Sequence, residues 1–328
     1  MTYSLQAVAS WQDVVDQIET FAAARGWTTS GGSGSAANLT NPSTGTVTVV
    51  TAGGSSLSLS ADGGAMTCDN RSPWLNGTYP GSPVVLNPVQ VHLFGNNSPY
   101  SAPDTEPFLT AVVGFGYNSY RHIYIGTMVA AGNYTNGDVI CCNDFSRSYT
   151  DLYPLNALSR YLFNAYQSHP GAGHGGVKIT HADNANTWRT FRTPSASSNS
   201  FPDNYNILYG TEVFGGNGDG INDGLTYRAH ADYAAGQLLV PVNLYCPDGA
   251  DGVDYRIRSL GHVSGARLVD MDGLEPEQQI SISADNWRVF PEFSKRSDAF
   301  LDWSEIGTTT YWPYELSGMF GLAYRENS

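Results

Sequence analysis

Three histidines and an aspartate between positions 169 and 183 form the most suggestive group of reactive side chains in this chain. His169, His174 and His181 precede Asp183, and imidazole and carboxylate groups both bind zinc and transfer protons. Their spacings do not place the three rings on one face of a helix, because Pro170 and several glycines interrupt the run. We therefore expect a polar loop here rather than a metal site.

A second candidate is the run of Gly, Asn and Asp at residues 215–224, which contains Asn217, Asp219 and Asp223. A calcium loop supplies six or more oxygen ligands and is typically closed by a bidentate acid. Counted from Asn217, the twelfth residue is Arg228, which cannot ligate a cation. A glycine-rich hairpin loop explains the same composition without an ion. We predict no metal, and keep these three residues as the candidates should one bind.

The remaining acids do not define a catalytic site. Asp248, Asp251 and Asp254 are regularly spaced, and an acidic turn explains them. The chain has no nucleophile elbow, phosphate-binding loop, dinucleotide fingerprint or zinc-protease motif. Glycoside hydrolysis needs only two carboxylates in a cleft, and a chain with 30 acids always offers some pair. We predict no enzyme, no catalytic residue and no cofactor, with polysaccharide cleavage not excluded.

The charge balance narrows the class of partner. The 328 residues include 16 Lys and Arg against 30 Asp and Glu, which gives a formal net charge of −14. Binding to nucleic acids or to anionic membrane surfaces requires clustered basic side chains, and the only lysines are Lys178 and Lys295. We therefore predict no nucleic-acid partner and no binding to an anionic membrane surface. Since no apolar run approaches about 20 residues, we also predict no membrane insertion.

The N-terminal residues indicate the compartment in which the chain folds, and the compartment in turn bears on the state of the cysteines. Residues 1–11 contain no basic residue and no apolar segment of the kind found in a secretory signal, so we expect the chain to fold in a cytoplasm. A reducing cytoplasm favours structural thiols at Cys68, Cys141, Cys142 and Cys246. A disulfide between the adjacent Cys141 and Cys142 stays open as an alternative.

The strongest helix signal covers residues 11–25. Ser10 is a good N-cap, and Asp13 three residues later resembles a capping box with a shorter acid. Apolar residues then recur at helical spacing, and Gly26 suits the position after the helix. The helix could pack on its own domain or dock onto a neighbouring subunit. In the second case Trp11, Phe21 and Trp27 are the candidate interface residues.

The sequence pattern of most of the remaining chain is typical of β-structure. Alternating apolar residues at 46–50 and 56–60 flank a Gly-Gly pair and predict a hairpin. Further strands are expected at 89–94, 108–115, 121–128 and 138–142, and a second helix at 154–168. Additional strands are predicted within 177–245 and 256–324. The fold class is therefore mainly β, with sandwich or barrel-like modules, an N-terminal amphipathic helix and one central helix.

These elements predict three regions. Residues 1–45 would form the helix and a flexible Gly/Ser-rich linker, together serving as an attachment element. Residues 46–245 would form a large β-rich domain that includes the central helix, and residues 246–328 a C-terminal β module. No repeat of fixed period and no heptad segment is present, which argues against solenoids, propellers and a coiled-coil shaft.

Several passages resemble a group of structural proteins from tailed bacteriophages and prophages. They are the segment from Trp11 to Trp27, the runs YRHIYIG at 120–126 and GNYTNG at 132–137, the run GHVSGARLV at 261–269, Ile280 with NWRVFP at 286–291, and SGMFGLAYR at 317–325. The resemblance covers most of the chain and is weakest over residues 28–107. It transfers no active-site residue.

The resemblance implies a component of the virion that acts through contacts between subunits, in the tail, baseplate or neck. Its partners would be other virion proteins and further copies of itself in a ring or symmetric attachment, and its location the virion, after assembly in the host cytoplasm. Two alternatives stay open: a module that binds a host receptor or surface glycan, and a capsid decoration protein. The high share of Arg among the bases and of Tyr among the aromatics fits an interface-rich protein.

Overall fold

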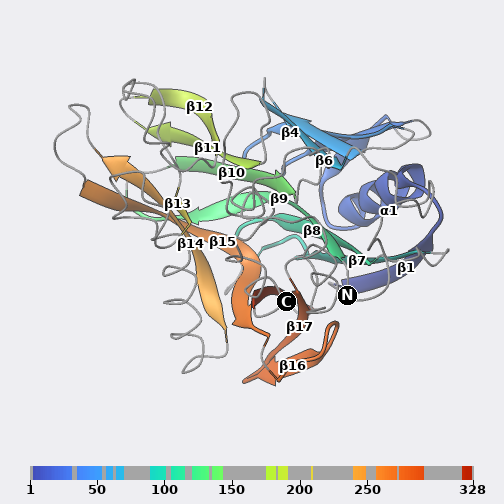
Figure 1. The fold of residues 1–328 in the computed structure, drawn as a ribbon. Helices are drawn as coiled ribbons and strands as arrows, with labels where there is room; N and C mark the ends of the chain where they lie inside the picture. The colour runs from blue at the N-terminus through green and yellow to red at the C-terminus, as the bar shows by residue number, and fades with distance from the viewer. Residues whose placement is uncertain are drawn as a thin grey trace, which may run out of the picture.

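The computed structural model describes a mainly β protein with curled antiparallel sheets and, within the described residues, one helix (Figure 1). The described residues are 3–31, 35–53, 57–61, 64–69, 89–100, 105–114, 120–132, 135–142, 175–181, 184–190, 208–209, 239–248, 256–271, 273–291 and 320–326. The expected central helix at 154–168 lies outside them. No helix in the described part of the chain is both long and apolar enough to cross a membrane.

The larger sheet has thirteen strands. Its main path runs β1-β7-β8-β9-β15-β18-β17-β16, with five further strands joined to the side. The path strands are β1 (Tyr3–Val8), β7 (Val89–Gly95), β8 (Phe108–Gly114), β9 (Tyr120–Ala130), β15 (Arg256–Asp270), β18 (Phe320–Arg325), β17 (Asp285–Pro291) and β16 (Gln279–Ile282). The side strands are β10 (Thr135–Cys142), β11 (Gly175–His181), β12 (Asn184–Thr190), β13 (Leu208–Tyr209) and β14 (Val240–Asp248).

The smaller sheet contains β2 (Thr28–Ser30), β3 (Ala36–Thr40), β4 (Val47–Ala52), β5 (Leu57–Ala61) and β6 (Gly64–Asp69) in chain order. The β4–β5 pairing confirms the predicted hairpin. Residues 28–30 and 36–40 are strands, which differs from the expected flexible linker. The reason is a weak alternation within the run: Ala37 and Leu39 are fully buried in the core, while Asn38 and Thr40 beside them are polar and only half-buried.

Helix α1 (Trp11–Ala23) forms where its sequence predicts it. The Asp13 N–H donates to Ser10 Oγ over 3.1 Å, which caps the first turn. Asp13 Oδ2 in turn accepts from the Ala9 N–H at 2.8 Å, one residue further back than in a capping box. The helix ends near Gly26, whose φ of 84° is the left-handed conformation that glycine adopts readily.

The helix lies between the two sheets, packed on β2, β3 and β4 on one side and on β1 and β7 on the other (Figure 1). Trp11, Phe21 and Trp27 are only 2%, 6% and 3% exposed, and all belong to the shared apolar core. The three residues expected as interface candidates are therefore core residues of the chain itself. The smaller sheet supplies the second apolar layer that the helix needs, so the helix requires no neighbouring subunit to cover it.

The main sheet curls so that β7 faces β17 and β18. Phe94 on β7 packs against Phe290 and Tyr324, with ring centroids 5.9 and 5.3 Å apart. These spacings are those of favourable aromatic pairs. Residues 256–270 form one long strand, β15, which pairs with β9. The residues of the expected C-terminal module therefore continue the sheet built by β1, β7, β8 and β9.

A glycine permits the close packing of β15 on β8. Gly265 has a φ of 65°, and the ring of Phe108 occupies the space where a Cβ would lie. Any other residue would meet both backbone strain and a clash there. Phe108 is 1% exposed and stacks beside Tyr124.

Candidate functional site

Few of the candidate reactive residues from the sequence lie within the described part of the structure. His181 lies at the end of β11 and Asp248 at the end of β14. The remaining candidates fall outside the described residues, namely His169, His174, Asp183, Asn217, Asp219, Asp223, Asp251 and Asp254. Within the ranges that the structure does describe, no three His, Cys, Asp or Glu side chains are grouped to hold a metal ion.

Two cysteines can be placed. Cys141 and Cys142 at the end of β10 are both buried, and no disulfide joins them. Adjacent residues of a strand point to opposite faces of the sheet, which separates their sulfur atoms. Cys68 and Cys246 lie on β6 and β14.

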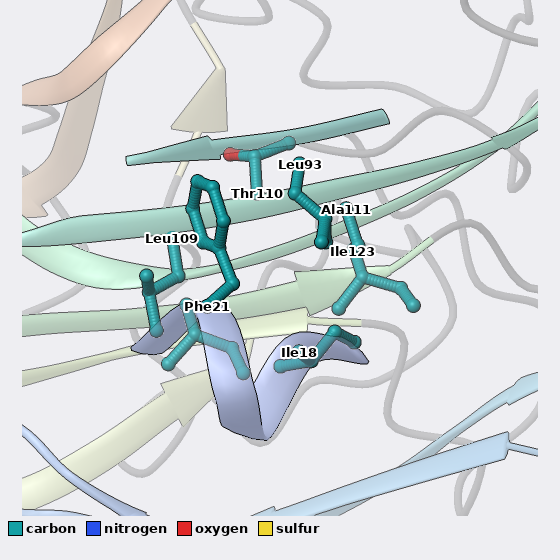
Figure 2. A pocket seen from close by; sticks show the side chains of 8 residues that line it. Ile18, Phe21, Leu93, Leu109, Thr110, Ala111 and Ile123 are labelled. Carbon is teal, nitrogen blue, oxygen red and sulfur yellow. The ribbon is translucent and has the colours of Figure 1, made fainter. Parts of the chain in front are cut away.

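An apolar pocket lies between α1 and the main sheet (Figure 2). Figure 2 shows Ile18 and Phe21 on the helix facing the strand residues Leu109 and Ile123. It has room for about one water molecule, far below the volume of a small-molecule site. This pocket is therefore a small gap in the packing of the core.

The first of two polar groups buried between elements is centred on Asp138 of β10, which is 3% exposed. Its Oδ1 accepts from Asn41 Nδ2 at 2.9 Å and from Thr44 Oγ1 at 2.6 Å. Its Oδ2 accepts from Thr46 Oγ1 at 2.5 Å. Asn41, Thr44 and Thr46 belong to the turn between β3 and β4, so this carboxylate fastens the smaller sheet to the larger one. We call these four residues the Asp138 joint.

The second group lies where the main sheet curls over itself, and its innermost member is His122 on β9. His122 is fully buried, with Nε2 3.0 Å from the Pro291 carbonyl and Nδ1 2.8 Å from the Tyr324 hydroxyl. A carbonyl only accepts, so Nε2 carries the proton and the Tyr324 hydroxyl donates to Nδ1. Burial lowers the pKa of His122 to about 3, so the ring is neutral at pH 7.

His92 on β7, which is also buried, has a similar arrangement. Its Nδ1 lies 3.0 Å from the Tyr3 hydroxyl, and its Nε2 lies 3.5 Å from Glu277 Oε1, within ion-pair range but without hydrogen-bond alignment. A carboxylate only accepts, so the neutral ring places its proton on Nε2 and accepts at Nδ1 from Tyr3. The imidazole thus stands between a phenol and a carboxylate.

Glu277 is the acceptor that several elements share. The Tyr120 hydroxyl of β9 donates to its Oε1 at 2.9 Å. The contact with His92 and the bond from Tyr120, helped by the charge of Arg288, lower the pKa of Glu277, against a smaller opposing effect of burial. Burial, together with the charge of this carboxylate and the bond to it, raises the pKa of Tyr120.

Arg288 on β17 fixes the backbone around this carboxylate. Its Nη1 donates to the Glu277 main-chain carbonyl at 2.7 Å, and its Nε pairs with Glu326 Oε1 at 2.5 Å. Its guanidinium carbon also lies 4.8 Å from the centre of the Tyr3 ring, a cation–π contact. We call Tyr3, His92, Glu277 and Arg288 the Glu277 cluster.

No sequence motif marks this cluster, because its members come from β1, β7, β17 and the connection before β16. The signal that was present is local: His92 and His122 each stand within an otherwise apolar predicted strand, beside aromatic residues. A polar residue at such a position is buried with a partner or marks a site. The cluster combines proton donors and acceptors in one chain, so it can respond to pH and can hold distant strands together.

Comparisons with known proteins add no assignment. No protein-family model matches this chain, and no curated protein matches its sequence.

Proposed function

We propose that this chain is a structural component of a tailed-phage virion, in the tail, baseplate or neck, and that it works through contacts between subunits. It would assemble in the host cytoplasm with other virion proteins and with further copies of itself in a ring or symmetric attachment. Sandwich-like or barrel-like packing of its β modules is part of this proposal.

The observation that carries the proposal is where the resembling passages lie. The runs at 120–126, 261–269, 286–291 and 320–325 fall on β9, β15, β17 and β18. In the main sheet these four strands are consecutive neighbours, in the order β9-β15-β18-β17. Passages that are far apart in the sequence therefore belong to one architectural unit, as a resemblance between whole domains requires.

The edges of the main sheet support a role in contacts. Leu5 on β1 is 44% exposed and Ile282 on β16 is 37% exposed, and these two strands end the main path. Neither strand contains a charged residue or a proline. Natural sheets usually block free edges with such residues, and an unblocked edge is where another chain can add.

The experiment is a deletion of the gene, followed by electron microscopy and infectivity assays of the particles. Particles that lack a tail, baseplate or neck element support the proposal, and normal infectious particles refute it. Complementation with Leu5→Lys or Ile282→Lys should restore incorporation poorly. The matched control is Ala24→Lys, an exposed position away from the sheet edges that should complement fully. A head defect or an adsorption defect alone would instead favour decoration or receptor binding.

A further inference from the structure

The smaller sheet presents an outer face without charged side chains on β3, β4 and β5. From Gly26 to Ala61 the sequence contains no Asp, Glu, Lys, Arg or His, although 14% of the whole chain is charged. Alternate residues of these three strands are buried on the side that α1 covers, and the residues between them point outward and stay partly exposed. Figure 1 shows β4 on the side of α1 away from β7 and β8.

The pairing register lines up the outward residues in two rows across the middle of this sheet. The rows are Asn38–Val49–Ser60 and Ala36–Thr51–Ser58, and we call these six residues the neutral face. Side chains of this size lose little conformational entropy when a contact orders them. Their hydroxyl and amide groups both donate and accept, so two such surfaces can satisfy each other's hydrogen bonds.

The charge of the rest of the chain indicates which partner suits this face. The net charge of −14 makes two copies repel through most of their surfaces, and a surface without charge is where they can approach at the lowest electrostatic cost. A basic partner would gain more from the acidic parts of the chain. The neutral face also has no aromatic side chain that could pack on a sugar ring, which disfavours a glycan.

We propose that two copies of this chain pack through their neutral faces, in an isologous contact that buries the same residues of each copy. This deepens the proposed function and rests on it for the presence of several copies in one particle. Five strands about 4.8 Å apart and about five residues long give a face of about 400 Å². Such an area is at the small end of specific interfaces, so the isolated pair should have a Kd on the order of 100 µM.

Sedimentation equilibrium of the purified full chain, at concentrations from about 10 to about 500 µM, tests this contact. The wild type should show a monomer–dimer equilibrium. Its Kd should fall by about threefold when NaCl rises from about 50 to about 500 mM, because salt screens the repulsion between two acidic chains. Thr51→Glu should raise the Kd at least about tenfold, because it places two like charges in the contact. Ser58→Glu on the neighbouring strand should do the same, and circular dichroism checks that each variant folds.

The matched control is Ala24→Glu, which adds the same charge at an exposed position outside the neutral face and should dimerise as the wild type does. Thr51→Ser keeps the hydroxyl and should also dimerise. The inference is overturned if the wild type stays monomeric at the highest concentration, with or without binding a glycan, if salt weakens the dimer, or if Thr51→Glu and Ala24→Glu change the Kd equally.

The two proposals can fail separately. A monomeric chain whose gene deletion still removes a tail, baseplate or neck element would refute the contact between neutral faces and leave the proposed function standing. A dimer that Thr51→Glu disrupts, together with normal infectious particles after deletion of the gene, would refute the proposed function and leave the contact standing.

Discussion

The Asp138 joint and the Glu277 cluster perform the same mechanical task with different chemistry. Each brings a carboxylate to a place where two distant parts of the chain meet. Asp138 is 3% exposed, and its carboxylate accepts from an amide and two hydroxyls. Glu277 is half-buried, and its partners are an imidazole, a phenol and, through the main chain, a guanidinium. These donors to Asp138 are neutral, whereas the partners of Glu277 include a cation.

The difference indicates which carboxylate contributes more to stability. Asp138 is deeply buried and accepts from three donors of the turn between β3 and β4, so its loss would leave buried donors without an acceptor. Glu277 is partly exposed, and water can replace part of its bonding. Removal of the Asp138 carboxylate should therefore cost more stability than removal of the Glu277 carboxylate.

The largest effect is expected at the Asp138 joint. Asp138→Ala leaves buried donors of Asn41 and Thr46 without their acceptor, so the free energy of unfolding should fall by about 4 kcal/mol. Urea unfolding measures this loss. The control is Asp16→Ala, a half-buried acid of α1 that bonds Gln12 within the helix, and it should cost less than about 0.5 kcal/mol. A loss below about 1 kcal/mol for Asp138→Ala would mean that the joint does not fasten the sheets.

The second effect is a pH dependence from His122. Its pKa is about 3 when folded and near its ordinary value of 6.5 when unfolded, so between these values the unfolded chain binds more protons. Stability should therefore fall as the pH drops through this window, by up to about 1.4 kcal/mol per pH unit. His122→Gln, which can still donate to Pro291 and accept from Tyr324, should flatten the slope. Equal slopes for the two proteins would contradict the assignment.

A smaller effect is expected from Glu277. Its pKa is lower when folded, so its ionised form adds stability above the ordinary value of about 4.5, and this is lost as the pH falls through the folded value. At neutral pH, Glu277→Gln should cost about 1 kcal/mol, the usual cost of one such bond. The cost should shrink in acid, which thermal unfolding at several pH values can follow. A cost that stays constant down to low pH would show that the charge of Glu277 plays no part.

The smallest effect is expected at a buried polar group that lies outside both the Asp138 joint and the Glu277 cluster. The Thr110 hydroxyl on β8 is buried and has no hydrogen-bond partner among the described residues. Thr110→Val keeps the shape and removes that hydroxyl, so stability should rise by about 1 kcal/mol. A clear loss of stability in urea unfolding would reveal a bond that the hydroxyl makes in solution.

Local sequence patterns predict much of the fold, but they predict neither the Asp138 joint nor the Glu277 cluster. Helix α1 and the β4–β5 hairpin follow from capping and alternation within short windows. The sequence predicts a linker at strands β2 and β3, because Gly, Ser and Thr outnumber the two buried apolar residues there, Ala37 and Leu39. Strand β1 was missed because its six residues show no clear alternation of apolar and polar types.

The polar regions depend on contacts that no window of sequence contains. Tyr120 and Glu277 are 157 residues apart, and Thr46 and Asp138 are 92 apart. Sequence spacing could mark His92 and His122 as unusual within their strands, but their partners are set by the curl of the sheet. The reactive residues that stand out in the sequence are close together along the chain, which does not require that they meet in space.

The most direct test of a role in the virion is the protein content of purified particles, measured by quantitative mass spectrometry against known head and tail proteins. We expect this chain to be present in a fixed number of copies that matches a symmetric tail, baseplate or neck element. Its absence from infectious particles, with the protein found only as a single chain in the host lysate, would contradict the proposal.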